Sequence, residues 1–369
     1  METIRVLLYN AGLGGGGRER RTVQLIRGLD RESWIQQAVM TYTDKGIYPE
    51  IFETKVKIHV QEERENREII FRNTEKIIND FKPDIVHVWN ENPRDVLPFI
   101  KLKKKYNYKL IAGFVADGNK VGYFSKGFLF MQYFFWYADA IVSNSKVGLI
   151  AKHAPQKKSY YIPNGFDFAR FEGLENPIAL RKEFGSDEDT CIVSMCARFT
   201  KDKDWNSFLQ IAKKSLDENL QVKFLAIGSG PLLDSYIAQS EKMELNNVLF
   251  LGQRTDVESI LHASDVCMLL TTGAHQEGFS NSVLESMAAG LPTIATKTGG
   301  TPEIINEGET GFMVPVEDWE AAFSILKKLI NDKELKVEVG NRAKKEVETN
   351  YTLDKMTERH IELYKTLLK

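Results

Sequence analysis

The stretch that says most about the fold is a loop with a carboxylate on either side of a turn that opens directly into a helix, Glu277-Gly278-Phe279-Ser280-Asn281-Ser282-Val283-Leu284-Glu285-Ser286-Met287-Ala288-Ala289-Gly290-Leu291-Pro292. Ser282 and Glu285 have the spacing of a capping box, which predicts a helix that begins near Asn281 or Ser282. Unpaired backbone N–H groups and the positive end of the helix dipole meet at such a start. We therefore expect an anion such as phosphate to bind there, between Glu277 and Glu285.

The two glutamates of this stretch admit two interpretations. In the structural one, Glu285 only caps the helix and Glu277 only solvates a loop, since capping boxes are common. In the functional one, acceptors suited to hydroxyl groups lie on both sides of a bound phosphate, as a nucleotide-sugar requires. The rest of the chain favours the functional interpretation.

Length and composition indicate a soluble protein of two domains. The 369 residues exceed one ordinary hydrophobic core, and 43% are hydrophobic and 27% charged. A formal net charge of -2 gives no overall field that would attract nucleic acid. The three cysteines, Cys191, Cys196 and Cys267, lie in apolar runs without a Cys-x-x-Cys pair, which fits a reducing cytoplasm.

Targeting and metal-binding signals are not found in the sequence. The chain passes from Met-Glu-Thr into an apolar run without a basic-then-apolar signal peptide, and no window has the ~20 apolar residues of a membrane span. Asp187-Glu188-Asp189 precedes an expected strand and reads as a solvated turn. Because targeting and membrane signals are not found, we expect a cytoplasmic protein. Because no cluster has metal-ligand spacing, we expect no metal, and we expect no cofactor.

Short apolar runs alternate with helical patterns, which predicts the α/β class with parallel sheets covered on both faces. The turn Pro163-Asn164-Gly165 stops regular structure. We expect two Rossmann-like domains that face each other across a cleft, at 1–165 and 166–351, and a final helix at 352–369, with its return to the first domain as an alternative. The expected strands are 4–9, 37–42, 57–60, 85–88, 109–114, 140–143, 160–162, 191–196, 223–227, 248–251, 266–270, 292–296 and 311–314.

Ligands of open parallel sheets bind beyond the carboxyl ends of the strands, so the loops there are the candidates. The loop 11–17 holds four consecutive glycines, which allow backbone to approach a phosphate closely. Its loose spacing and the lack of an acidic residue after the next strand argue against a nicotinamide cofactor, and a flexible turn is the other interpretation. In the loop 197–205, Arg198 and Lys203 are suited to a diphosphate, although solvated charges are the commoner fate of such residues.

Together these motifs resemble the retaining glycosyltransferases of the GT-B fold, in the large family 4, over most of the chain. The strongest part is the segment from Glu277 to Glu285, which is similar to the paired-glutamate motif of the family with seven residues between the glutamates. Further blocks follow in the family's order, namely Gly16–Arg20, Ile162–Asp167, Arg198 with Lys203, Gly228–Pro231 and Val248–Gly252.

The resemblance implies a role for each matching residue. Arg198 and Lys203 would bind the diphosphate of the donor and stabilise it as leaving group, Glu285 would hold the ribose hydroxyls, and Glu277 would hold the donor sugar. Arg198, Lys203 and Glu277 are thereby the expected catalytic residues, and no metal is required. The full set of expected donor-binding residues is Gly15, Gly16, Arg198, Lys203, Gln253, Arg254, Glu277, Gly278, Phe279, Ser280, Asn281, Leu284 and Glu285.

One departure concerns the amino-terminal domain. Many members of the family carry a histidine near the sugar, whereas Val115 or Ala116 stands at that position here and Asp117 follows. Asp117 and His275 are weaker candidates for contact with the acceptor or the sugar. The aromatic run 127–137 is either a helix of the domain core or a surface that rests on a membrane or holds a lipid-linked acceptor.

The function that the resemblance implies is metal-independent sugar transfer from a nucleotide-sugar to a hydroxyl of a saccharide or lipid-linked acceptor. A UDP-sugar is favoured and a GDP-sugar is the alternative. We expect a role in bacterial surface polysaccharide or glycolipid biosynthesis, in the cytoplasm, with peripheral contact with the inner face of the membrane as an open alternative and no nucleic-acid partner. Two rival functions are a nucleotide-sugar 2-epimerase of the same fold and a noncatalytic nucleotide-sugar-binding protein.

Overall fold

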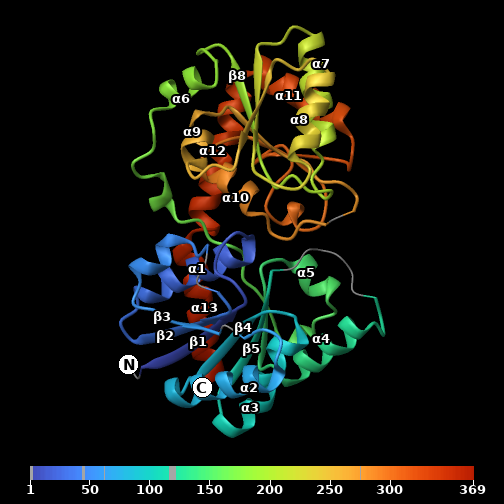
Figure 1. Ribbon diagram of the computed structural model, residues 1–369. Coiled ribbons are helices and arrows are strands. Elements are labelled where there is room, and N and C mark those ends of the chain that lie inside the picture. Colours follow the sequence, from blue (N-terminus) through green and yellow to red (C-terminus); the bar gives the residue numbers. More distant parts are fainter. Residues whose placement is uncertain (1–2, 44–45, 62, 116–121, 275) are drawn as a thin grey trace. The chain divides into compact units, whose positions relative to one another are not determined.

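The chain divides into two compact units in the computed structural model, which describes residues 3–43, 46–61, 63–115, 122–274 and 276–369 (Figure 1). Unit 1 combines Met1–Gly165 with Thr352–Lys369, and unit 2 comprises Phe166–Tyr351. Each unit has its own sheet and its own hydrophobic core. None of the helices within the described ranges is long and apolar enough to cross a bilayer.

Unit 1 is built, within the described residues, on a seven-stranded sheet of order β3-β2-β1-β4-β5-β6-β7 whose strand pairs are parallel. The strand order reverses between β1 and β4, and ligands of such sheets bind at the carboxyl ends beside that reversal. The strands are β1 (Ile4–Asn10), β2 (Ile35–Thr41), β3 (Lys57–Val60), β4 (Ile85–Trp89), β5 (Lys109–Phe114), β6 (Ala140–Ser143) and β7 (Ser159–Tyr161).

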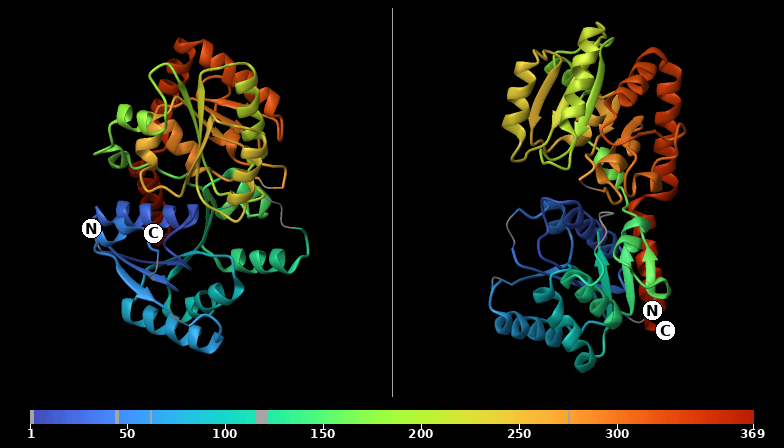
Figure 2. Two further views of the ribbon diagram at one scale, coloured as in Figure 1. Left: turned by 45° about the horizontal axis from the view of Figure 1, so that its top comes forward. Right: turned by 90° about the vertical axis from the view of Figure 1, so that its right-hand side faces the viewer.

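Helices cover both faces of this sheet (Figure 2). Side chains of α1 and α13 pack on one face, and those of α2, α3 and α4 on the other. Gly28 of α1 allows α13 to approach closely, because a Cβ there would lie 2.0 Å from Thr357 Oγ1. The helices are α1 (Gly17–Asp30), α2 (Arg67–Phe81), α3 (Pro93–Tyr106), α4 (Lys126–Tyr137), α5 (Lys146–Ala151) and α13 (Leu353–Leu368), with 3₁₀ turns η1 (Pro49–Glu53) and η2 (Gln156–Lys158).

A buried polar cluster fastens α13 to the rest of unit 1. His87 Nδ1 lies 3.0 Å from the Tyr364 hydroxyl. Arg21 is fully buried and donates to Asn164 Oδ1 at 2.6 Å and to the Ile162 carbonyl at 2.7 Å. Because α13 is the last helix of the chain, the contact between His87 and Tyr364 ties a distant segment to the first unit, while Arg21 joins α1 to the segment after β7.

Unit 2 contains, among the described residues, a six-stranded sheet of order β10-β9-β8-β11-β12-β13, again with parallel pairs. Its strand order reverses between β8 and β11, so the loops after these two strands diverge at one point. The strands are β8 (Cys191–Cys196), β9 (Val222–Ile227), β10 (Val248–Gly252), β11 (Val266–Leu269), β12 (Thr293–Thr296) and β13 (Phe312–Val314).

The helices of unit 2 also lie on both sides of the sheet (Figure 2). Side chains of α7, α8 and α11 join one core cluster, and those of α6, α9 and α10 pack into clusters of the other face. The elements are α6 (Pro177–Glu183), α7 (Trp205–Asp217), α8 (Leu233–Lys242), α9 (Val257–Ala263), α10 (Asn281–Ala288), α11 (Trp319–Asn331) and α12 (Lys333–Asn350), with 3₁₀ turns η3 (Phe168–Phe171) and η4 (Thr301–Glu303).

The predicted class, two Rossmann-like parallel-sheet domains, is confirmed. The strands expected at 109–114, 140–143 and 191–196 have those bounds as β5, β6 and β8. The sequence did not signal α12, because its buried positions are the small residues Val339, Gly340, Ala343 and Val347 and its remainder is strongly polar. Gly340 packs directly on α10's end, since a Cβ there would lie 2.1 Å from the Gly290 carbonyl oxygen.

The buried histidines predict that acid destabilises unit 1. Burial lowers the pKa of His87 well below its usual value and that of His360 to about 3, and the charge of Arg21 adds to both shifts. Only the unfolded chain takes up these protons below pH 6.5, so stability falls as the pH drops. For His360 we expect a loss of about 2 kcal/mol between pH 7.5 and pH 5, measured by urea unfolding.

The variants His360→Leu and His262→Gln test this assignment. His262 is exposed on α9, so its replacement is the matched control and should leave the acid sensitivity unchanged. His360→Leu should make the pH dependence shallower by about 2 kcal/mol over this range, with the contribution of His87 remaining. An equally steep loss of stability in both variants would contradict the assignment to His360.

Candidate functional site

The candidate site of unit 2 lies where its strand order reverses. The loop after β8 and the loop after β11 are joined there by main-chain hydrogen bonds: Asp204 N donates to Leu270 O at 2.9 Å, and Thr272 N donates to Asp202 O at 3.1 Å. These bonds hold two loops from different strands as one surface. The surface carries the predicted residues Lys203 and Glu277.

Lys203 and Glu277 form a buried ion pair at this point, with Nζ in direct contact with Oε1. Their side chains are only 11% and 13% exposed, and Asp202 Oδ2 lies 3.7 Å from the same Nζ. Burial lowers the pKa of Lys203 to about 8, while Asp202 opposes this shift and Arg198 adds to it. The ammonium group is thus poorly solvated and well placed to bind an incoming anion.

Arg198 presents an exposed side chain on a firmly anchored backbone. Its carbonyl accepts a hydrogen bond from Trp205 Nε1 at 3.1 Å, and the next residue, Phe199, stacks on the Trp205 ring at 4.0 Å. The guanidinium forms no ion pair with any residue that the structure describes. Asp204 caps α7 by accepting from Ser207 N at 2.9 Å, which accounts for an aspartate where the resembled family often has glycine.

The helix α10 begins where the sequence predicts, but the predicted capping box is wrong. Ser280 is the N-cap, and its Oγ accepts from Val283 N at 3.5 Å. Ser282 lies inside the helix and donates instead to the Cys196 carbonyl at 2.9 Å, which docks α10 on the end of β8. Glu285 therefore does not cap the helix, and its carboxylate forms an ion pair with another residue.

That partner is Arg170, on η3. Arg170 Nη2 lies 2.9 Å from Glu285 Oε1 and also contacts Glu258 Oε1 on α9. The three side chains are 13–16% exposed. Arg170 and Glu258 were not predicted from the sequence. The one available signal was that Arg170 lies three positions after the family-like block Ile162–Asp167. A lone arginine at such a place is usually interpreted as a solvated loop charge.

A glycine turn after β12 supports the main chain of the paired-glutamate segment. Gly300 N donates to the Glu277 carbonyl at 2.7 Å. Gly299 has φ +52, and a Cβ there would lie 1.9 Å from the same carbonyl oxygen. Any larger residue would displace the loop that carries Glu277.

The remaining donor-binding candidates of unit 2 differ in what they can offer. Leu284 and Phe279 are 2% and 3% exposed, so their side chains belong to the core and are closed to a ligand. Gln253 is exposed and accepts from Ser229 Oγ at 3.4 Å. Arg254 is held by Asp256 through two hydrogen bonds of 2.8 and 2.6 Å. Gly278 and Asn281 lie beside the Ser280 cap and are half-buried.

The candidates of unit 1 lie at the end of β1, beside the reversal of its own sheet. Gly16 is the N-cap of α1 and has extended backbone, and Gly15 has φ +85. A strand, a glycine loop and a helix therefore follow one another as the sequence predicts. Asp117 and His275 lie outside the described residues.

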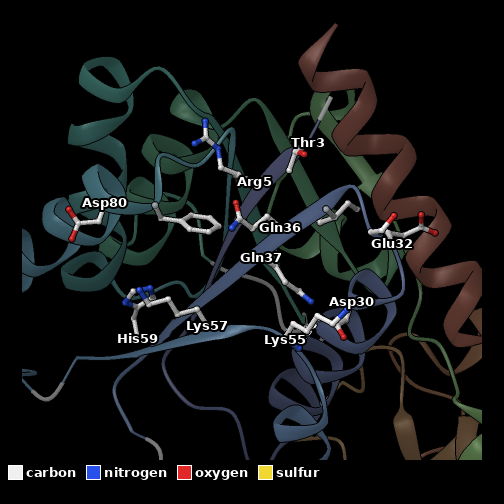
Figure 3. A pocket seen from close by; sticks show the side chains of 13 residues that line it. Thr3, Arg5, Asp30, Glu32, Gln36, Gln37, Lys55, Lys57, His59 and Asp80 are labelled. Atoms are coloured by element: carbon white, nitrogen blue, oxygen red, sulfur yellow. Dashed lines mark hydrogen bonds between the residues drawn. The ribbon is translucent and has the colours of Figure 1, made fainter. Parts of the chain in front are cut away.

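A depression of about 840 Å³ in unit 1 lies at the other end of the strands, beside the amino ends of β1, β2 and β3 (Figure 3). Its walls mix the cations Arg5 and Lys57 with the carboxylates Asp30, Glu32 and Asp80, and it contains none of the predicted site residues. Among the described residues, no group of three or more His, Cys, Asp or Glu side chains is arranged to hold a metal ion.

Two Rossmann-like parallel-sheet units of this order define the fold of the GT-B glycosyltransferases. One similar solved structure is that of Anabaena Alr3699/HepE in complex with UDP and glucose, with a TM-score of 0.81 and 16% identity over 98% of this chain and 100% of that one. At that identity the likeness shows the fold. The amino-acid sequence is more specific: residues 178–346 match the family model of "Glycosyl transferases group 1".

Curated relatives agree with the family model. N-acetyl-alpha-D-glucosaminyl L-malate synthase of Bacillus anthracis is 31% identical over 52% of this chain and 49% of its own length. The capsular polysaccharide biosynthesis glycosyltransferase CapM of Staphylococcus aureus is 30% identical over 56% and 54%. The chain thus spans about half the length of the curated relatives it matches.

The Gly299 turn gives a structural prediction. Gly299→Ala should lower the thermal unfolding temperature by about 3 °C or more, because alanine meets both an unfavourable φ and the Glu277 carbonyl. Gly273→Ala is the control, since its Cβ would meet only Val316 at 3.6 Å. Differential scanning calorimetry of both variants checks this, and equal melting temperatures would contradict it.

Proposed function

We propose that the chain is a retaining glycosyltransferase of family 4 that moves a sugar from a nucleotide-sugar to an acceptor hydroxyl. Unit 2 would bind the donor and unit 1 the acceptor. The process would be the synthesis of a bacterial surface polysaccharide or glycolipid, in the cytoplasm. The family match of residues 178–346 and the curated relatives support the reaction class.

One observation carries the proposal: Lys203 and Glu277 meet at the strand reversal of unit 2, with the exposed Arg198 on the same loop. Strand reversals are where α/β sheets bind nucleotides. Two cations at such a point suit a diphosphate, with Arg198 as a planar fork and Lys203 as a point charge. Glu277 would be released from Lys203 when the phosphate arrives and would then accept hydroxyls of the sugar.

The chemistry of transfer follows from these groups. The bond between the anomeric carbon and the phosphate oxygen breaks, the acceptor oxygen bonds to the same carbon, and the acceptor proton passes to the departing phosphate. Negative charge grows on the phosphate in an oxocarbenium-like transition state. Arg198 and Lys203 would stabilise that charge, which is the largest effect available to a preorganised site.

The donor is proposed to be a UDP-sugar, and the process to be independent of metal. The complex of Anabaena Alr3699/HepE with UDP and glucose supports uridine, and GDP-sugars remain the alternative. Thermal shifts across UDP, GDP and their sugars should identify the base, since a ligand stabilises the state that binds it.

Equal turnover with and without EDTA would support metal independence, and loss of turnover in EDTA would refute it.

The product of incubation with the donor separates the rival functions. Released UDP or GDP supports transfer, an epimerised donor supports a 2-epimerase, and an unchanged donor that nevertheless raises the melting temperature supports a noncatalytic binding protein. The absence of any binding would refute all three.

Lys203→Ala is the sharpest test of the site. Turnover, measured as nucleoside diphosphate release, should fall by ~10²-fold or more, because a buried cation at the leaving group is lost. Lys201→Ala removes an exposed lysine of the same loop and should leave turnover unchanged. Unchanged turnover in a folded Lys203→Ala protein would remove Lys203 from the site.

Peripheral membrane contact is a second part of the proposal and rests on α4. The expected core helix is buried on one face only, through Met131, Phe134 and Phe135. Its other face and the preceding turn form what we call the α4 aromatic surface, which is 40–82% exposed and consists of Tyr123, Phe124, Leu129, Tyr133, Trp136 and Tyr137. Aromatic side chains of this kind are suited to the membrane interface.

Cations accompany the α4 aromatic surface. Lys103 donates to the Tyr137 carbonyl at 2.8 Å but is also paired with Asp139 at 2.9 Å, whereas Lys158 donates to the Trp136 and Ala138 carbonyls at 3.1 and 2.9 Å. Lys158 forms no ion pair with any residue that the structure describes, so it places positive charge beside the exposed rings. A bilayer with anionic lipid is therefore the occupant that we propose, and it would bring a lipid-linked acceptor to unit 1.

Sedimentation with vesicles tests this contact. The wild-type protein should sediment with anionic phosphatidylglycerol vesicles more than with neutral phosphatidylcholine vesicles, and Trp136→Ser with Tyr133→Ser should reduce binding several-fold. Phe52→Ser is the control, because Phe52 is 66% exposed on η1, outside the α4 aromatic surface. No binding by the wild type, or equal loss in the control, would contradict the proposal.

A further inference from the structure

The contact of one arginine with two carboxylates, Glu285 and Glu258, is unexplained by the roles assigned so far. We propose that Arg170 is a positioning residue that aims Glu285 at the ribose hydroxyls of the donor nucleotide, with Glu258 holding the guanidinium in place. The inference rests on the proposed function, in which Glu285 receives those hydroxyls. It adds two residues from η3 and α9 to the donor site of unit 2.

The backbone around Arg170 is fixed by its neighbours. Phe166 is 1% exposed, and its N–H donates to the Tyr351 carbonyl at 2.7 Å. Asp167 caps η3 by accepting from Ala169 N at 3.2 Å. The Arg170 guanidinium lies over the Phe166 ring, 5.0 Å from its centroid. The side chain thus extends along a buried aromatic ring towards Glu285 and has little freedom to leave it.

Charge balance explains why the arginine is needed. Glu258 and Glu285 are only 15% and 16% exposed, and both contact the same guanidinium nitrogen of Arg170. Although burial alone would lower the pKa of Arg170, the charges of Glu285 and Glu258 raise it. The guanidinium therefore stays charged and compensates the negative charges of the two carboxylates that it contacts.

The geometry leaves one carboxylate oxygen for a ligand. Arg170 contacts Oε1 of Glu285, and Oε2 has no hydrogen-bond partner among the residues that the structure describes. A carboxylate oxygen that is fixed in position is a strong acceptor for hydroxyl groups. Loss of Arg170 would remove the contact that fixes Glu285 and leave its side chain free to rotate, and the preference for ribose would weaken.

The test compares UDP with 2′,3′-dideoxy-UDP, or the guanosine pair if GDP is the nucleotide that binds, by calorimetric titration. The wild type should bind the ribonucleotide about 10-fold or more tightly than its dideoxy analogue. Arg170→Gln should bring that ratio close to one and leave the affinity for the dideoxy analogue nearly unchanged. Arg170→Lys and Glu258→Gln should give intermediate ratios.

Controls separate this inference from its premise. Glu285→Gln should abolish the preference directly, and Arg342→Gln should retain it, since Arg342 is exposed on α12 and paired only with Glu338 among the described residues. A wild-type ratio retained by a folded Arg170→Gln protein, or equal weakening of both ligands, would overturn the inference alone. Failure of the wild type to bind either nucleotide would overturn the proposed function.

Discussion

The candidate site depends on one buried ion pair, Lys203 with Glu277, whose members are 74 positions apart in the chain. Burial of a lone charge is costly, whereas a paired charge is tolerated. The strand reversal between β8 and β11 brings the two loops together, and main-chain hydrogen bonds between them keep the pair in place. In the proposed function, an anionic ligand would replace Glu277 as the partner of Lys203.

The same principle of charge compensation recurs at Glu285, where Arg170 balances two carboxylates. Local contacts fix the backbone around both pairs. They are the Ser280 cap of α10, the glycine turn at Gly299, and the stacking of Trp205 on Phe199, the residue after Arg198. Because the side chains stand on loops braced by the sheet, their geometry can be set before a ligand arrives. Preorganisation of this kind is what makes electrostatic stabilisation effective.

Unit 1 meets different demands. Its sheet is covered on one face by α1 and the distant α13, which contacts the sheet through His87 and Tyr364, and on the other face by α2, α3 and α4. The helix α4 contacts both the core and the solvent with apolar side chains, because such side chains lie around most of its circumference. One side completes the core, and the other leaves aromatic rings exposed, as an interface with lipid would require.

The sequence by itself determined the α/β class, most strand positions, the start of α10 and the residues that meet at the switch point, because apolar periodicity and motif spacing are local properties. It did not determine that Ser280 caps α10, that α4 has an exposed side, or that Arg170 contacts Glu285 from 115 positions away. Those outcomes depend on which loops the order of the sheet brings together. Only the tertiary structure decides that, since ion pairs between remote segments leave no periodic signal.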